Sequence, residues 1–230
     1  QNSGLSWFQK AVKRLVDLVI AVLGLVITSP ILLIVAVCIK VCDGGPVFFF
    51  QERCTLGGKV FRICKFRSMI VDAEKDGKSR PATDDDDRIT PVGKVIRKTR
   101  IDELPQLFNV LKGDMSIVGP RPERVEHVEI YTKEIPEFVY RMKVKGGLTG
   151  YAQVYGKYNT TAYDKLKMDL MYIENYSLLL DIKLILMTVK VMFMKASTEG
   201  FSEKQQKDIR DGGDRPWTEK TNDGAGNERS

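Results

Sequence analysis

The chain has 230 residues, of which 43% are hydrophobic and 29% are charged. This length can bury one substantial core, and the composition is globular on average although the apolar residues are unevenly spread. The net charge of +6 favours anionic partners such as lipid head groups, nucleotides or nucleic acid, without choosing among them. The four cysteines fit none of the usual zinc spacings, which excludes that class of site and indicates reduced, structural thiols.

The N-terminus consists of a basic flank, residues 1–14, followed by an almost wholly apolar run, residues 15–41. The run is about as long as a membrane-spanning helix. It is too long for the apolar part of a cleaved signal peptide, so that interpretation is not favoured. Leu178–Met194 is a second apolar run, but the charges within it suit a helix in the membrane interface or packed on the core.

Ser29 and Pro30 divide the first apolar run into two arms that are each too short to cross the hydrocarbon. The hydroxyls of Thr28 and Ser29 can satisfy the carbonyls that the proline leaves without a donor. Basic residues flank both ends of the run, and positive charge tends to stay on the cytoplasmic side. The sequence therefore predicts a re-entrant helix that enters and leaves by the cytoplasmic face, with a kinked spanning helix as the alternative.

A β-hairpin is predicted from two runs rich in strand-forming residues, 47–51 and 60–65, on either side of Leu56-Gly57-Gly58. The second run continues into an alternating basic segment that contains Lys65 and Arg67. Such cations can clamp a phosphate at the end of a strand, but a solvated basic edge has the same pattern.

Asp102 and Glu103 form an acidic pair at a predicted helix start, because Thr99 and Asp102 match a capping pattern and apolar residues then recur at helical spacing. Arg97 and Arg100 precede the pair, so a phosphate could approach it, and the same positive fields should keep Asp102 ionised. An ionised carboxylate can attack phosphorus directly. The alternative is that Asp102 only caps an amphipathic helix.

Two further segments carry candidate ligand-binding groups. Gly119-Pro120-Arg121-Pro122 cannot be helical, so Arg121 is either a rigidly held anion-binding group or part of a simple turn. The glycine-rich loop 146–150 precedes Gln153 but lacks both common nucleotide-binding patterns. His127, the single histidine, is expected to be exposed rather than catalytic.

These motifs together resemble the bacterial sugar transferase family, the monotopic polyprenyl-phosphate phosphoglycosyl transferases of exopolysaccharide, capsule and glycoprotein glycan assembly. The likeness runs from about residue 8 to residue 201 and rests on KFRSM at 65–69, DELPQL at 102–107, NVLKGDMS at 109–116 and GPRP at 119–122. Ser29-Pro30 and Asp102-Glu103 match the helix break and acidic pair of that family. Larger relatives have further membrane helices before this region, so the chain is expected to be the catalytic part of such a protein.

The resemblance implies a reaction in which Asp102 attacks the sugar-bearing phosphate of a UDP-sugar, releases UMP and carries the phosphosugar to polyprenyl phosphate. It places Mg²⁺ at Asp102 with Glu103 as its support, and it assigns phosphate or nucleotide binding to Arg97, Arg121, Lys65, Arg67 and Gln153. The partners would be the UDP-sugar, polyprenyl phosphate and membrane phospholipids, with no nucleic acid and with homo-oligomers left open. The location would be the cytoplasmic face of the bacterial inner membrane.

The expected fold is α+β and mostly helical. It combines the re-entrant helix broken at Ser29-Pro30, a β-hairpin and amphipathic interfacial helices with a cytosolic catalytic domain, residues 42–201. Residues 202–230 are polar and glycine-rich, so they are expected to form a disordered tail. A membrane-anchored module that only binds anions, and a hydrolase that passes the phosphosugar to water, are the alternative functions.

Overall fold

A computed structural model describes residues 6–73, 86–156 and 160–192. The predicted tail, 202–230, and the last residues of the predicted catalytic domain therefore lie outside the described residues. The longer elements are α1 (Trp7–Asp43), β1 (Phe48–Cys54), β2 (Val60–Phe66), α2 (Pro91–Lys98), α3 (Gln106–Lys112), α4 (Val125–Glu134), α6 (Ala162–Glu174) and α7 (Leu178–Met192). The shorter elements are β3 (Ser116–Val118), β4 (Gly147–Thr149), α5 (Tyr151–Tyr155) and the 3₁₀ turns η1 (Leu56–Gly58), η2 (Ile101–Glu103) and η3 (Pro136–Lys143).

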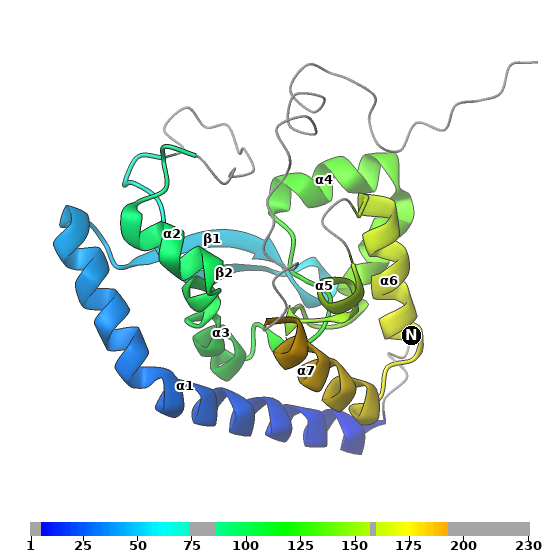
Figure 1. Ribbon diagram of the computed structural model, residues 1–230. Coiled ribbons are helices and arrows are strands. Elements are labelled where there is room, and N and C mark those ends of the chain that lie inside the picture. The colour runs from blue at the N-terminus through cyan, green and yellow to red at the C-terminus, as the bar shows by residue number, and fades with distance from the viewer. Residues whose placement is uncertain (1–5, 74–85, 157–159, 193–230) are drawn as a thin grey trace, which may run out of the picture.

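Helix α1 is continuous through Pro30, so the prediction of a break between two separate arms is replaced by one bent helix. Figure 1 shows it running along one side of the molecule and then bending toward the hairpin. Pro30 has no N–H for the carbonyl of Val26, and the Ser29 hydroxyl donates to that oxygen at 2.8 Å instead. The predicted role is therefore confirmed for Ser29. The Thr28 hydroxyl donates to Gly24 at 2.6 Å, and this carbonyl is not the one that the proline leaves without a donor, so the same prediction is not confirmed for Thr28.

Within the described residues, α1 is the one helix long and apolar enough to cross a membrane. Only 11% of its most apolar window is buried by the rest of the protein, whereas a core helix of a soluble protein would be mostly covered. Its N-terminus is closed by a capping box between Ser6 and Gln9, and its C-terminus by Gly44 at a φ of 69°. These caps explain why the helix extends beyond the apolar run at both ends.

The predicted hairpin is present as antiparallel strands β1 and β2, with Phe48 opposite Phe66 and Cys54 opposite Val60. The turn between them contains Gly57 and Gly58 at φ values of 69° and 76°, which favour glycine. The hairpin carries Lys65 near the end of β2 and leads into the centre of the molecule.

The predicted helix start at Thr99 is wrong. Thr99 instead ends α2, and its hydroxyl donates back to Val95 at 2.9 Å. The chain then turns through Arg100, the one non-glycine residue with positive φ among the described residues, and forms η2 before α3 begins at Gln106. Thus the acidic pair lies in a separate 3₁₀ turn ahead of the helix.

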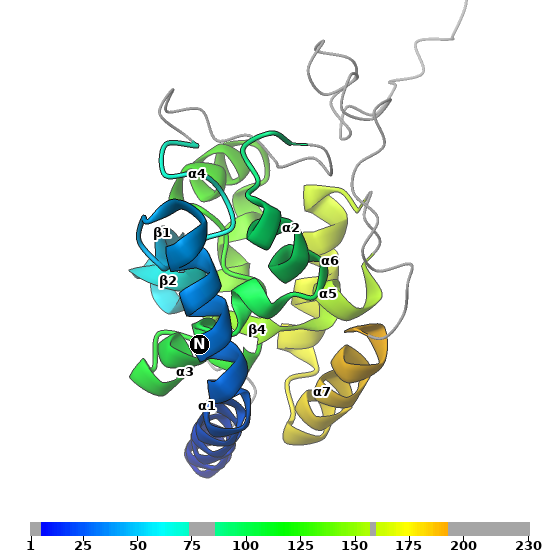
Figure 2. The same cartoon turned by 60° about the vertical axis from the view of Figure 1, so that its left-hand side comes forward.

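The main core joins the hairpin, α3, α6 and α7 around a short parallel pair, β3 and β4, that the sequence analysis did not predict. The views in Figures 1 and 2 agree in placing α1 and α7 along one side of this core and α4 on the opposite side. A Cβ on Gly147 would lie 2.1 Å from the backbone nitrogen of Gly119, so this close pairing requires glycine. The pairing brings the segment after β3 against the glycine-rich loop.

Helix α7 packs one face on the core and exposes another, as expected for the second apolar run. Leu184 is fully buried, whereas Leu179 is 77% and Leu186 is 66% exposed. The carboxylate of Asp181 lies 2.6 Å from the buried Lys13 ammonium of α1, and this ion pair ties the two helices together. Helix α7 therefore lies beside the start of α1 and keeps part of its apolar surface exposed.

Candidate active site

Glu103 is held by two cations from separate segments. Lys65 of β2 donates to Oε1 at 2.9 Å, and the guanidinium of Arg121 pairs with both carboxylate oxygens. Burial, the largest single influence, would raise the pKa of Glu103, but Arg121 and Lys65 together hold it well below the ordinary value of 4.5. Glu103 is therefore a fixed, permanently ionised group, only 16% exposed.

Asp102 has a different environment. No hydrogen bond or ion pair involves its carboxylate in the part of the chain that the structure describes. Burial and the charge of Glu103 raise its pKa from 3.8 to about 6, and this outweighs the lowering by Lys65, Arg97 and Arg121. Asp102 is thus mostly ionised at pH 7, as expected, although burial and Glu103 outweigh the positive fields in setting its pKa.

The backbone before the pair explains how neighbouring residues acquire such different roles. Arg100 adopts a left-handed conformation with φ 57° and ψ 17°, which is uncommon for a residue with a side chain. Its carbonyl accepts from the N–H of Glu103 at 3.2 Å, and Ile101 accepts from Leu104 at 3.1 Å. This tight turn fixes Glu103 toward its two cations while the side chain of Asp102 keeps its oxygens unpaired.

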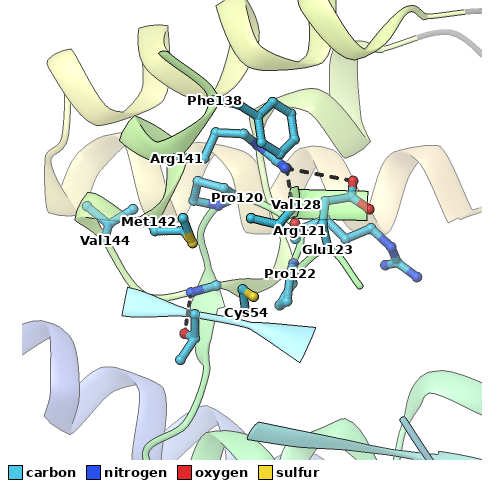
Figure 3. Close-up of a pocket in the computed structure, with 12 residues that line it drawn as sticks. Cys54, Pro120, Arg121, Pro122, Glu123, Val128, Phe138, Arg141, Met142 and Val144 are labelled. Atoms are coloured by element: carbon cyan, nitrogen blue, oxygen red, sulfur yellow. Dashed lines mark hydrogen bonds and ion pairs between the residues drawn. The ribbon is translucent and has the colours of Figure 1, made fainter. Parts of the chain in front are cut away.

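The rigid segment around Arg121 is held from behind. Arg141 donates to the carbonyl of Arg121 at 3.0 Å, and Arg53 donates to the carbonyl of Pro122 at 3.0 Å. The backbone of Arg121 faces the small pocket drawn in Figure 3, whereas the guanidinium of Arg121 extends away from that pocket. The predicted rigid arginine is thus present, and its rigidity comes from these contacts as well as from the prolines.

Arg141 is itself anchored by acids. Its Nε donates to the buried carboxylate of Asp169 at 2.6 Å, and its Nη1 lies 3.8 Å from Glu123. Burial would raise the pKa of Glu123, but the neighbouring imidazole of His127 and the charge of Arg141 lower it to about 2. Sequence reasoning missed this supporting network, because its members are far apart in the chain and match no local pattern. His127 lies at the edge of this network, with its Nδ1 at 3.9 Å from Glu123.

A largely apolar cavity of about 260 Å³ opens beside Glu103 and Arg121. Its lining comes from α1, α3, the β3–β4 pair, α5 and α7, and it includes Ile20, Leu107, Leu148, Val154 and Ile185. The arrangement joins a cation–carboxylate site to an apolar space between α1 and α7. The sequence analysis did not predict this cavity, because distant segments form it.

Gln153 lines the same cavity, in agreement with its assignment to the cleft. Both polar atoms of its side chain are buried without a partner among the described residues. An amide in this state can donate to and accept from a ligand, and a buried amide without partners is costly. Gln153 therefore has the properties of a group that binds a polar ligand.

Two of the other predicted site residues lie at the acidic pair. Lys65 contacts Glu103, and the charge of Arg97 lowers the pKa of Asp102. Arg67 has another partner. It is buried, and its guanidinium pairs with Asp43 at the end of α1. This contact ties α1 to β2, so we leave Arg67 out of the proposed phosphate site.

The residues present fit a divalent cation that is shared with substrate. No cluster of three protein ligands occurs within the described ranges. Magnesium is, however, commonly bound by one or two carboxylates together with substrate phosphates and water. Asp102 has unpaired oxygens and a raised pKa, whereas Glu103 is already occupied by cations, so Asp102 is the ligand that this site can offer.

Comparisons with known proteins define the class. Residues 8–195 match the family model described as bacterial sugar transferase. The chain is 47% identical over 184 residues to the UDP-N-acetylgalactosamine-undecaprenyl-phosphate N-acetylgalactosaminephosphotransferase of Aeromonas hydrophila, covering 79% of this chain and 43% of that protein. It is 44% identical over 201 residues to the UDP-glucose:undecaprenyl-phosphate glucose-1-phosphate transferase of Klebsiella pneumoniae, covering 85% and 43%.

A third relative, the uncharacterized sugar transferase EpsL of Bacillus subtilis, is 42% identical over 178 residues, covering 77% of this chain and 85% of that protein. The chain belongs to the bacterial sugar transferase family. It spans less than half the length of the first two relatives. The family and the long apolar helix together indicate a membrane-associated protein.

Proposed function

We propose that the protein transfers a sugar 1-phosphate from a UDP-sugar to polyprenyl phosphate, releasing UMP, through a covalent intermediate on Asp102. The observation that carries this proposal is the contrast within the acidic pair. Glu103 is held by Arg121 and Lys65, whereas the neighbouring carboxylate has no partner in the described structure and stands beside the same cations. The names of the relatives, which are undecaprenyl-phosphate sugar phosphotransferases, support this class of reaction.

In the first step, an oxygen of Asp102 attacks the phosphorus that carries the sugar. A bond forms between that oxygen and phosphorus, and the bond from phosphorus to the bridging oxygen breaks, so UMP leaves with the electron pair. No proton is required, because the carboxylate enters the reaction already ionised. Arg121 and Lys65 stabilise the negative charge on the phosphoryl oxygens.

In the second step, a phosphate oxygen of the polyprenyl acceptor attacks the same phosphorus. The bond to Asp102 breaks, and the carboxylate is restored together with a polyprenyl-diphosphate-sugar. The apolar cavity supports an acceptor that enters with its hydrocarbon part between α1 and α7 and its phosphate toward Arg121. The unpaired amide of Gln153 would bind a polar group of either substrate.

Mg²⁺ would be held by Asp102 and the substrate diphosphate, with Glu103 fixing the cations around it. When bound, it would supply charge neutralisation for the diphosphate. Arg97 adds positive potential at the same carboxylate.

The proposed location is the cytoplasmic membrane face, with α1 re-entrant. The contacts at the two ends of α1 support this arrangement, because Lys13 pairs with Asp181 and Asp43 pairs with Arg67 of the same folded body. Arg14 also donates to the carbonyl of Val110 at 2.6 Å. A helix whose two ends contact one body does not separate those ends across a bilayer.

The test is the full chain in membranes, supplied with a panel of UDP-sugars, with UMP and lipid-linked product measured separately. We expect UMP release with at least one sugar, and loss of release by several orders of magnitude in Asp102→Asn. Asp87→Asn is the matched control, since Asp87 is exposed and lies outside the site.

Full UMP release by Asp102→Asn would overturn the covalent mechanism. UMP release by the wild-type chain that yields free sugar phosphate with or without polyprenyl phosphate would indicate a hydrolase. Binding of UDP-sugar without any product would indicate the non-catalytic anion-binding module.

A further inference from the structure

A second, strongly basic cavity lies at the start of the membrane helix. It has a volume of about 320 Å³, and the lining shares no residue with the apolar cavity of the active site. Five cationic side chains from two distant segments line it: Lys10, Lys13, Arg14, Lys143 and Lys145. Nothing in the proposed transfer reaction uses this cavity.

The two cavities lie on opposite sides of β3. Ser116 lines the basic cavity, whereas the next residue, Ile117, lines the apolar one. Neighbouring residues of a strand point to opposite faces, so the strand separates the two spaces. A ligand in the basic cavity would not occupy the site of the acidic pair.

Two of the five cations have protein partners. Lys13 pairs with Asp181 at 2.6 Å, and Arg14 donates to the carbonyls of Val110 and Leu111 at 2.6 and 2.8 Å. Arg14 remains positively charged after these contacts, because its acceptors are neutral carbonyls at the end of α3.

The other three cations have no anionic partner in the described structure. Lys10 and Lys143 are exposed, and Lys143 lies over the ring of Tyr140 at 4.2 Å. Lys145 is half-buried, and its burial and the charge of Arg14 lower its pKa. The group would regain its ordinary pKa beside an anion.

The nearby acids do not neutralise this excess. Asp17 is the one acid in the lining, so its charge offsets only one of the five cations, while its carboxylate accepts from the Ser116 hydroxyl at 2.8 Å and the Ile117 N–H at 3.0 Å. Asp114 lies close enough to raise the pKa of Lys145. Its carboxylate, however, already pairs with the ammonium groups of Lys59 and Lys112, at 3.5 and 3.4 Å. The cavity therefore keeps a net positive charge that protein groups leave unmatched.

The place of the cavity indicates its ligand. Lys10 and Arg14 stand on α1 immediately before its apolar run, which starts at Leu15. Trp7 and Phe8 nearby are 83% and 69% exposed, as is typical of aromatic side chains at a membrane interface. We propose that this cavity binds the phosphate head group of one anionic phospholipid, held by Lys145, Lys143, Lys10 and Arg14.

This proposal rests on the membrane association of α1 but not on the transfer reaction. The test is native mass spectrometry of the full chain in a neutral detergent, which removes the surface potential of a bilayer. The chain is titrated with phosphatidylglycerol, with phosphatidylcholine, and with glycerol phosphate alone. We expect one bound phosphatidylglycerol and much weaker binding of the other two probes.

The variant is Lys143→Gln with Lys145→Gln, and its matched control is Lys133→Gln with Lys167→Gln on α4 and α6. We expect roughly 30-fold weaker phosphatidylglycerol binding by the first pair, from the usual contribution of a lysine to anionic-lipid binding, and no change in the second. Both variants should release UMP in detergent at the wild-type rate, which also shows that they fold.

Equal binding of phosphatidylglycerol by wild type and the first variant would overturn the proposal. So would equal binding of phosphatidylcholine, which lacks net charge. Binding of glycerol phosphate as tightly as the lipid would make this a site for a free anion and would also overturn it. Loss of UMP release in wild type and both variants alike would count against the proposed reaction without bearing on lipid binding.

Discussion

At the scale of single residues, the contrast between Asp102 and Glu103 is the basis of the proposed chemistry. One carboxylate is fully occupied by cations, and the other is raised in pKa by burial and by its neighbour's charge. A raised pKa makes Asp102 a better nucleophile when ionised, since basicity and nucleophilicity rise together. The raised pKa also means that Asp102 begins to gain its proton closer to neutral pH.

The pKa of about 6 belongs to Asp102 before Mg²⁺ binds, so it sets the pH dependence of the first step at limiting UDP-sugar and Mg²⁺. Because the ionised form reacts, UMP release should fall about tenfold for each unit of pH well below about 6 and should level off above about 7. The measurement is the rapid phase of UMP release without polyprenyl phosphate, whose own second proton is lost near pH 6. A rate independent of pH between about 5 and 7 would contradict this assignment.

Replacing Glu103 should shift that profile. In Glu103→Gln the negative charge that raises the pKa of Asp102 is absent, and Lys65 and Arg121 lose their main partner. The midpoint of the pH profile should therefore move below about 6, while the maximal rate falls because the two cations are no longer oriented. Glu137→Gln, at an exposed position on η3, should leave both quantities unchanged. An unmoved midpoint with a lower rate would show that Glu103 has no electrostatic effect on its neighbour.

At the scale of elements, α1 is decisive because it both meets the membrane and lines the active-site cavity. Pro30 bends the helix, and the Ser29 hydroxyl satisfies the carbonyl that the bend leaves without a donor. The two ends of the helix then return to the same body through Lys13 and Asp43. In the proposed re-entrant arrangement, the bend would set how deeply the apolar part enters the bilayer.

A cysteine at the N-terminal end of α1 tests whether the helix re-enters, because a spanning helix would place that end outside the cell when the rest of the protein is cytoplasmic. In Trp7→Cys, made with Cys38→Ala and Cys42→Ala to remove the exposed native thiols, a membrane-impermeant maleimide added to intact cells should give no labelling, and labelling should appear after the cells are permeabilised. Lys133→Cys in the same background should behave in the same way. Ready labelling of the cysteine at position 7 in intact cells would favour a spanning helix.

Features that depend on neighbours in sequence were the predictable ones. The Ser29-Pro30 bend and the hairpin follow from local preferences, and the structure contains both. The helix start at Thr99 failed because a Thr-x-x-Asp spacing does not show whether the threonine begins one helix or ends another. Here α2, which the sequence analysis did not identify, ends at that point.

Features that depend on distant pairing were not predictable. Arg67 stands in the same basic segment as Lys65, but the structure pairs it with Asp43 and brings only Lys65 to the acidic pair. The raised pKa of Asp102 also depends on burial, which a charge count does not register. For the distant pairing of Asp181 with Lys13, the sequence did offer a signal. Asp181 interrupts the apolar run of α7, and a charge in such a run requires a partner.

At the scale of the whole molecule, the fold places a polar site and an apolar space together beside the long apolar helix α1. Segments from α1 to α7 contribute to the cavity beside Arg121 and Glu103. The basic cavity lies on the other side of β3, at the start of the membrane helix. The protein thus has two separate cavities, one at the proposed transfer site and one at the proposed lipid-binding site.

Filling the apolar cavity should separate the two steps of the reaction. Val154→Phe adds bulk to a residue of the lining, so polyprenyl phosphate should enter poorly while UDP-sugar still reaches Asp102. We expect transfer to the lipid acceptor to fall about tenfold or more, with the initial release of UMP unchanged. Val95→Phe on the exposed surface of α2 is the control. Equal loss of both steps would place the acceptor elsewhere or indicate general damage to the site.

The most direct measurement is the mass of the full chain after reaction with a UDP-sugar in the absence of polyprenyl phosphate. The account predicts an adduct with the mass of one sugar phosphate, mapped by peptide fragmentation to Asp102 and discharged when polyprenyl phosphate is added. Asp102→Asn should form no adduct. Rapid formation of lipid-linked product by a protein that never carries this mass, or that carries it on another residue, would contradict the mechanism.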